Sequence, residues 1–334
     1  MRITRDILLS TAKDTVRRAT LGAHDLVCAY ITGSLVTEDP LIGGTTDIDL
    51  VYVHSIEVPA EREIIPVSED LHLDIIHLHD SFFNTPRRLR TDAWVGSFLC
   101  HYPIPLYDAG HWFEYVQAGI YAHFYDPPNI IQRVRSFAEK ARVSWLQLQT
   151  NHRHFNIESI SVYISCLRDA ANAVACLVSV PLTNRRFLLD YPLRTQELNM
   201  PGLAGGLIDL IVPEEPIEPD WDSWLADWSS DFGQLQNRHD VPLDFQAVRK
   251  PYYEKAILEL KEENQEAALW ILLWSWTEIS SHLSGMPSNN HSFRQFCQTL
   301  MIGEGNYDHR IASLDSYLDA VEETIERWES FNGI

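Results

Sequence analysis

The chain has 334 residues, of which 45% are apolar, and it carries 26 basic side chains against 47 acidic ones, for a net charge of −21. This length and apolar content suffice for one large or two modest domains with buried cores. Binding to nucleic acid depends on Lys and Arg side chains that neutralise phosphates, so the acidic balance argues against a nucleic-acid partner. It is compatible with a small cationic ligand or a protein partner, and acidity also serves solubility.

The first part of the chain predicts a helix and then a sheet. Residues 2–20 carry apolar side chains at helical spacing without a continuous apolar stretch, so they predict an amphipathic helix rather than a signal peptide. Apolar and alternating runs predict strands over 26–32, 47–54 and 72–79. Residues 91–101 predict a further helix. The prolines within 103–108 predict a short strand at a sheet edge, because proline cannot donate to a ladder.

The second part of the chain predicts helices, which begin after the break at Asp126-Pro127-Pro128. Apolar residues recur at intervals of three or four over 129–149, 157–180, 183–198, 252–282, 291–300 and 309–332. Residues 213–240 combine prolines with acids and predict a surface excursion with short helical turns. Its tryptophans form either a packing stripe or a ligand box; they are Trp221, Trp224 and Trp228. The pattern predicts an α+β protein, with an α/β domain over 1–125 and a larger all-helical domain over 126–334.

Cysteine usage and hydropathy indicate the cellular compartment of the protein. The five cysteines form no Cys-x-x-Cys pair, and Cys28 lies in a predicted buried strand, so we expect reduced core residues in a cytoplasmic protein. The longest apolar run, Ala267 to Trp274, has eight residues and is too short to span a bilayer.

The residues with the clearest chemistry follow the first predicted strand. Gly33-Ser34 ends an apolar run, and Asp47 and Asp49 alternate with apolar residues in the next strand. Side chains at i and i+2 of a strand share a face, so the two carboxylates lie side by side. Two carboxylates at such a short distance repel each other unless a cation compensates their charge, and Mg²⁺ prefers oxygen ligands of this kind. Gly43-Gly44 gives the intervening loop the freedom to turn.

A third acid, Asp74, is embedded among apolar residues of the strand over 72–79. An unpaired charge in a buried strand is costly, so we expect Asp74 to lie beside Asp47 and Asp49 and to share a metal with them. The alternative is a hairpin loop that exposes its acids to solvent.

These elements resemble the nucleotidyltransferase superfamily typified by DNA polymerase beta, and the resemblance implies an N-terminal core with a mixed sheet and flanking helices. The family pattern is a Gly-Ser pair after an apolar strand, then Asp-x-Asp, then a third acid on a later strand, and it covers about the first 110 residues here. The resemblance implies that Asp47, Asp49 and Asp74 are catalytic residues that hold two Mg²⁺ ions. It also implies that Gly33 and Ser34 grip the triphosphate of a nucleotide, with polar contacts from Thr46.

The chain resembles in particular the aminoglycoside nucleotidyltransferases, which carry a C-terminal helical domain. The resemblance therefore implies transfer of AMP from ATP to a hydroxyl of a small-molecule acceptor, with release of pyrophosphate. The alternatives are modification of a protein or RNA, as in toxin–antitoxin members of the superfamily, a catalytically dead relative, and a non-enzymatic nucleotide-binding regulator. The expected partners are a nucleoside triphosphate, a small acceptor and, in a homodimer, a second copy of the chain.

The helical domain is expected to supply the acceptor pocket, in a cleft beside the α/β domain walled by residues within 140–190. Asp169 and Glu278 lie on largely apolar helices and are either a general base or ordinary helix-surface acids. Arg185-Arg186 either binds phosphates of the donor or forms a salt bridge with Asp190.

Two groups of histidines resemble metal sites only at first sight. His72 differs in strand parity from His77 and His79, so these three do not share a face. We predict structural roles for them, and the same roles for His152 and His154.

Overall fold

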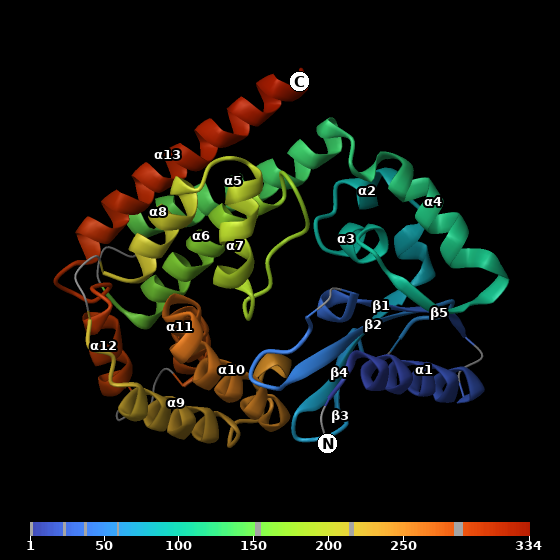
Figure 1. Cartoon of the computed structure of the whole chain (residues 1–334), viewed down its shortest axis with the longest axis horizontal. Coiled ribbons are helices and arrows are strands. Elements are labelled where there is room, and N and C mark those ends of the chain that lie inside the picture. The colour runs from blue at the N-terminus through green and yellow to red at the C-terminus, as the bar shows by residue number, and fades with distance from the viewer. Residues whose placement is uncertain are drawn as a thin grey trace. The chain divides into compact units, whose positions relative to one another are not determined.

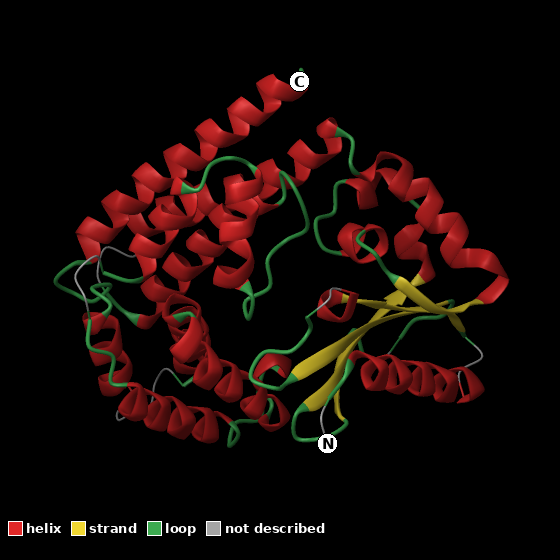
Figure 2. Cartoon of the chain, in the orientation of Figure 1, coloured by secondary structure: helices red, strands yellow, loops and turns green. Residues whose placement is uncertain are grey.

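A computed structural model of the chain describes residues 3–22, 25–36, 39–58, 60–150, 155–213, 217–283 and 290–334. The chain divides into two compact units, Met1–Ile130 and Ile131–Ile334. The division lies within helix α5 (Pro127–Thr150), and the boundary expected between residues 125 and 126 falls just before this helix. The first unit contains the sheet and the second is helical, so the predicted α+β class is confirmed (Figure 2).

The sheet of the first unit has five strands in the order β3-β4-β2-β1-β5. The neighbours β2 and β4 are parallel and the other pairs are antiparallel, so the sheet is mixed as predicted. The strands are β1 (Leu26–Thr32), β2 (Thr46–His54), β3 (Arg62–Pro66), β4 (Leu71–His79) and β5 (Ile104–Asp108). The edge position predicted for the proline-containing strand β5 is confirmed. Strand β3 was not predicted, because it is short and only half-buried and lacks apolar alternation.

Helices cover both faces of this sheet (Figure 1). Helix α1 (Arg5–Gly22) buries Leu8, Ala12 and Val16, four residues apart, against the face that carries Ile48 and Leu50. The opposite face packs against helices α2 (Pro86–Arg90), α3 (Val95–Cys100) and α4 (Trp112–Phe124). Short 3-10 helices complete the unit: η1 (Gly33–Val36), η2 (Asp80–Phe83) and η3 (Ala109–His111).

The second unit is built around helix α11 (Gln265–His282), which is buried on almost all sides and packs against α6, α7, α9, α10 and α12. The helices before it are α6 (Ile157–Ala175), α7 (Phe187–Glu197), α8 (Gly202–Ile211), α9 (Trp221–Leu235) and α10 (Lys250–Glu263). Those after it are α12 (Asn290–Thr299) and α13 (Tyr307–Asn332). The 3-10 helices η4 (Leu243–Phe245) and η5 (Ala247–Arg249) precede α10. No helix in the described ranges is long and apolar enough to cross a membrane.

Two helix predictions for this unit were wrong. The single helix expected over 252–282 is two helices, because the side chain of Asn264 accepts a hydrogen bond from the backbone N–H of Ala267 and caps α11. The short turns expected around the tryptophans are one helix of 15 residues, α9, which Asp220 caps in the same way. Trp228 is fully buried and donates to Ser275 Oγ, which supports the packing stripe over the ligand box.

All five cysteines lie among the described residues, where they are buried and form no disulfide with one another. Burial raises the pKa of the Cys176 thiol to about 12, with Arg133 and Arg194 acting in the opposite direction. Such a thiol stays protonated at neutral pH and packs as a small apolar group.

Candidate metal centre

The parallel pairing of β2 with β4 brings three carboxylates together. Asp49 is the register partner of Asp74, and Asp47 lies two residues before Asp49 on the same face of β2. One oxygen from each of the three carboxylates lies within 4.8 Å of the others. Asp47 and Asp74 are buried and Asp49 is half-buried. The three predicted acids therefore form one cluster of hard oxygen ligands, which suits a divalent cation such as Mg²⁺.

Gly33 lies against this cluster at the end of β1. Its neighbour Thr32 is the register partner of Asp49, and Gly33 itself has a φ of +70°. A Cβ atom at Gly33 would lie 1.7 Å from Asp49 Oδ2. Both the backbone conformation and the space taken by the Asp49 carboxylate therefore require glycine. The structure brings Gly33 to the side of the carboxylates, and Ser34 follows it directly in η1.

The loop between Ser34 and the cluster turns at the glycine pair. Gly43 and Gly44 have φ values of +61° and +68°, and the backbones of Ile42 and Thr45 exchange two hydrogen bonds across them. Two successive positive φ values are those of the tight hairpin turn that favours Gly-Gly. The turn leads directly into β2 and its aspartates.

Thr46 is not brought to the carboxylates. It precedes Asp47 on β2, so its side chain lies on the opposite face of the strand. The side chain is fully buried, and its hydroxyl donates to the Asp47 carbonyl oxygen at 3.1 Å.

One residue of this centre was not predicted, Arg62 on β3. Its Nε donates to Asp74 Oδ1 at 2.7 Å and its Nη2 donates to Asp74 Oδ2 at 2.6 Å. This is a bidentate pair, the strongest geometry between these two groups. Its signal in the sequence is weak, an arginine between two glutamates ahead of the Asp74 strand, and it becomes informative only through the pairing of β3 with β4.

Arg185 belongs to the second unit, just before α7. Its guanidinium lies 3.8 Å from the centre of the Tyr252 ring, and Arg249 lies 4.6 Å from the same ring. The predicted contact of Arg185 with a donor nucleotide stays a prediction. Asp190, its alternative partner, has a pKa that burial raises and that Arg186 and Arg194 act to lower.

The two candidate acids of the helical unit share one property. Burial raises the pKa values of both Asp169 and Glu278. Arg168 acts on both carboxyls in the opposite direction. Their assignment as a general base stays a prediction.

Among the histidines of β4, His72 is buried and is the register partner of Asp47, whereas His77 and His79 lie at the other end of the strand from the carboxylates. His77 Nδ1 is 2.9 Å from His54 Nε2, and His77 Nε2 is 3.0 Å from Glu63 Oε1. His54 Nδ1 lies 2.7 Å from Asp25 Oδ2, which completes a hydrogen-bonded chain across four segments of the unit. His79 instead accepts from the backbone N–H of Ser81 and begins η2. His152 and His154 lie outside the described residues.

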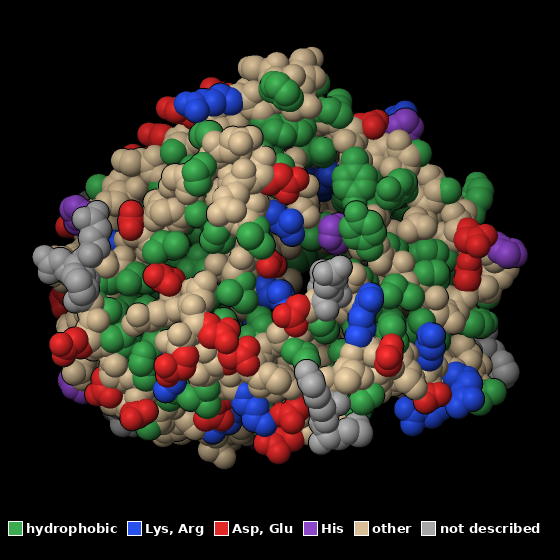
Figure 3. Space-filling view, in the orientation of Figure 1, with side chains coloured by type: hydrophobic (Ala, Val, Ile, Leu, Met, Phe, Trp, Pro, Cys, Tyr) green, Lys and Arg blue, Asp and Glu red, His purple; other side chains and the backbone are tan. Residues whose placement is uncertain are grey.

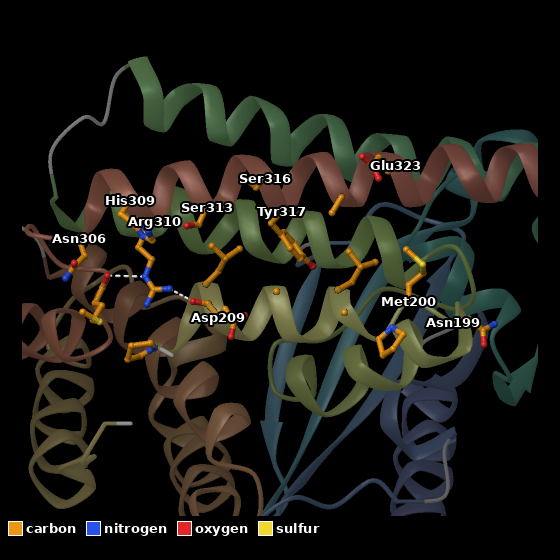
Figure 4. A pocket seen from close by; sticks show the side chains of 18 residues that line it. Asn199, Met200, Asp209, Asn306, His309, Arg310, Ser313, Ser316, Tyr317 and Glu323 are labelled. Carbon is orange, nitrogen blue, oxygen red and sulfur yellow. Dashed lines mark hydrogen bonds between the residues drawn. The ribbon is translucent and has the colours of Figure 1, made fainter. Parts of the chain in front are cut away.

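A groove of about 1030 Å³ runs between α8 and α13 in the second unit (Figure 4). Small residues of both helices line it, including Gly206 and Ser313. At one end the guanidinium of Arg310 donates to the backbone carbonyl oxygens of Asp209, Leu300 and Met301. Arg310 thereby caps the carboxyl ends of two helices, which is a structural role.

Taken together, the first unit presents a cluster of three acids on a mixed sheet, flanked by a glycine and an arginine that fit it closely. This geometry defines a candidate divalent-cation centre.

No protein-family model matches the chain, and no curated protein matches it. Among solved structures, one similar protein is a nucleotidyltransferase-like protein from Exiguobacterium sibiricum 255-15, at 10% sequence identity and a TM-score of 0.35. The similarity covers 94% of this chain and 91% of that chain.

Proposed function

We propose that the first unit catalyses Mg²⁺-dependent nucleotidyl transfer, in which AMP moves from ATP to a hydroxyl of a small-molecule acceptor. The observation that carries the proposal is the approach of Asp47, Asp49 and Asp74 to within 4.8 Å on adjacent strands. In the reaction, the acceptor oxygen bonds to the α-phosphorus, the bond to the pyrophosphate oxygen breaks, and the acceptor hydroxyl loses its proton.

The three carboxylates fit the cation that this chemistry uses. An ionised carboxylate has about four lone-pair sites, so Asp74 keeps acceptor capacity for a metal while both of its oxygens accept from Arg62. Bound Mg²⁺ would neutralise the triphosphate and polarise the reacting oxygens.

The residues of the chain supply position and access. The Gly33 backbone lies so close to Asp49 that a donor phosphate bound to the same cation would also contact this backbone. Ser34 offers a hydroxyl and an N–H for the same phosphates. With both oxygens held by Arg62, Asp74 serves as an oriented ligand, and the proton of the acceptor goes to another base.

The charge of the protein supports a small acceptor. The net charge is −21, and Asp and Glu side chains are spread over the face seen in Figure 3. A polyanionic acceptor would be repelled by such a surface, whereas a hydroxylated or aminated small molecule would not.

Thermal unfolding with a non-hydrolysable ATP analogue and Mg²⁺ tests the donor half of the proposal. We expect a rise in Tm that requires both additions, is lost in Asp49→Asn and is kept in the control Glu57→Gln, which changes an exposed acid. Absence of this rise in the wild type would contradict the proposal.

Transfer itself is tested with α-³²P-labelled ATP and a panel of hydroxylated and aminated small molecules. Label that moves to a small molecule with release of pyrophosphate supports the proposal. Label that moves only to RNA or protein would identify the macromolecule-modifying alternative, and nucleotide binding without transfer to any acceptor would identify a regulator.

A further inference from the structure

The bidentate pair of Arg62 with Asp74 has an unusual location. Asp74 is buried in the acid cluster, with 6% of its side chain exposed, whereas 32% of the Arg62 side chain is exposed. Arg62 is on β3, one of the two edge strands of the sheet, and β3 is the neighbour of the strand that carries Asp74.

The strand register explains how the Arg62 side chain reaches Asp74. Ile64 is the register partner of Asp74, and Arg62 is the partner of Ile76, so Arg62 and Asp74 share a face and lie on a diagonal. A long side chain spans such a diagonal across neighbouring strands. The fork then fixes the plane of the Asp74 carboxylate through both of its oxygens.

We propose that Arg62 is a positioning residue and built-in counter-charge of the acid cluster, a role that rests on the proposed metal-dependent function of the site. In the metal-free protein its positive charge offsets the repulsion among three carboxylates held within 4.8 Å. When a divalent cation binds, the same charge opposes it. Arg62 therefore stabilises the empty site and weakens its affinity for metal.

This role predicts two effects of opposite sign on removing the charge. Arg62→Met keeps much of the stem and removes the guanidinium. The metal-free protein becomes less stable, because the carboxylates lose their compensation. Mn²⁺, a substitute for Mg²⁺ that binding experiments can follow, binds about tenfold more tightly, because a nearby positive charge is gone. An arginine that only supports the fold would lower both stability and metal affinity.

Two further variants separate charge from geometry. Arg62→Lys keeps the charge and loses the fork, so it retains wild-type Mn²⁺ affinity. In an Asp74→Asn background, Arg62→Met causes a smaller loss of metal-free stability than in the wild type, because the carboxylate that Arg62 contacts directly is already neutral. Arg87→Met, which changes an exposed arginine of α2, is the matched control and leaves both quantities unchanged.

The experiment measures urea unfolding of the full metal-free chain and Mn²⁺ binding by calorimetry, without nucleotide. Lower stability with tighter Mn²⁺ binding in Arg62→Met, and a smaller stability loss from the same substitution in the Asp74→Asn background, support the proposal. Equal or weaker Mn²⁺ binding in Arg62→Met, or additive stability losses in the double variant, overturn it. Neither readout needs nucleotidyl transfer, so if the wild type transfers nothing while these effects hold, the proposed function fails and the counter-charge role stands.

Discussion

Replacing Gly33 with alanine is the most direct test of how closely the backbone fits the acid cluster. The new Cβ would lie 1.7 Å from Asp49 Oδ2, and real Cβ contacts stay above 3.0 Å, so the carboxylate must move away. The chain offers a matched control in Gly44, which has a nearly equal φ of +68° but no atom within 4 Å of an added Cβ. The two substitutions share backbone strain and differ in the contact with Asp49.

The expected magnitudes follow from these two terms. A left-handed backbone conformation costs an L-residue about 1–2 kcal/mol, which is the whole effect expected of Gly44→Ala. Gly33→Ala adds about 1–3 kcal/mol for the forced displacement of a packed side chain. Mg²⁺ requires ligand oxygens at about 2.0–2.1 Å, so a displacement of this size removes Asp49 from coordination. We expect metal affinity to fall about 100-fold, the upper end of what disturbed ligand positioning causes.

Urea unfolding with and without metal measures both terms. At a metal concentration of about 100 Kd, binding stabilises the wild type by about 2.7 kcal/mol, and a 100-fold weaker site leaves about 0.4 kcal/mol. Gly44→Ala should keep the full metal-dependent stabilisation. Equal metal-dependent stabilisation in the two variants would refute the inference that Gly33 is required by the position of Asp49.

Three further predictions concern charge. Asp47→Asn should leave the metal-free protein as stable as the wild type or more so, because it relieves repulsion, and should abolish metal-dependent stabilisation and transfer; a variant that still transfers at the wild-type rate would contradict this. Burial raises the pKa of Glu278 in the folded protein. The unfolded chain therefore loses the carboxyl proton at a lower pH than the folded protein does. Stability falls as the pH rises from about 4.5, the ordinary pKa of the group, to its raised pKa in the folded protein. Glu278→Gln should remove this fall in stability with pH and should be more stable than the wild type at pH 7, which unfolding measured across this pH range tests. The control Glu304→Gln, which changes an exposed acid, should keep the wild-type profile. Arg142 on α5 forms ion pairs with Asp315, Asp319 and Glu322 of α13. Arg142→Ala should therefore lower the free energy of unfolding in urea by about 1 kcal/mol, and by less at high salt, whereas the control Arg327→Ala, which removes a single exposed ion pair, should lower it by about 0.3 kcal/mol. A loss in Arg142→Ala that does not respond to salt would argue against an electrostatic origin.

The core of the sheet and the acid cluster could be predicted because their signals are local. Strand alternation places Asp47 and Asp49 on one face, and an acid within the apolar β4 requires a partner. The same alternation excludes Thr46 from that face, so its expected contact came from the resemblance alone. Parity within one strand thus carries more information than proximity in sequence.

What could not be predicted depends on pairing between strands. Arg62 reaches Asp74 only through the register of β3 with β4, and His54 reaches His77 only through that of β2 with β4. In the helical unit, residues 261–266 are all polar and include no glycine or proline, so a sequence compatible with a helix runs through Asn264, and the cap at Asn264 separates α10 from α11. A helix cap depends on a single side chain, and an apolar pattern that is read over many residues does not reveal it.

Two rows of polar residues cross the same strands, one on each face of the sheet. One row runs from Arg62 on β3 through Asp74 and Asp49 to Gly33 at the end of β1. The other runs from Glu63 through His77 and His54 to Asp25, just before β1. A slip of one residue between β2 and β4 would move every side chain of β4 to the other face and break both rows at once. Both rows of polar contacts therefore specify the register of β2 with β4. The geometry of the acid cluster depends on this pairing of strands, and no single loop determines it.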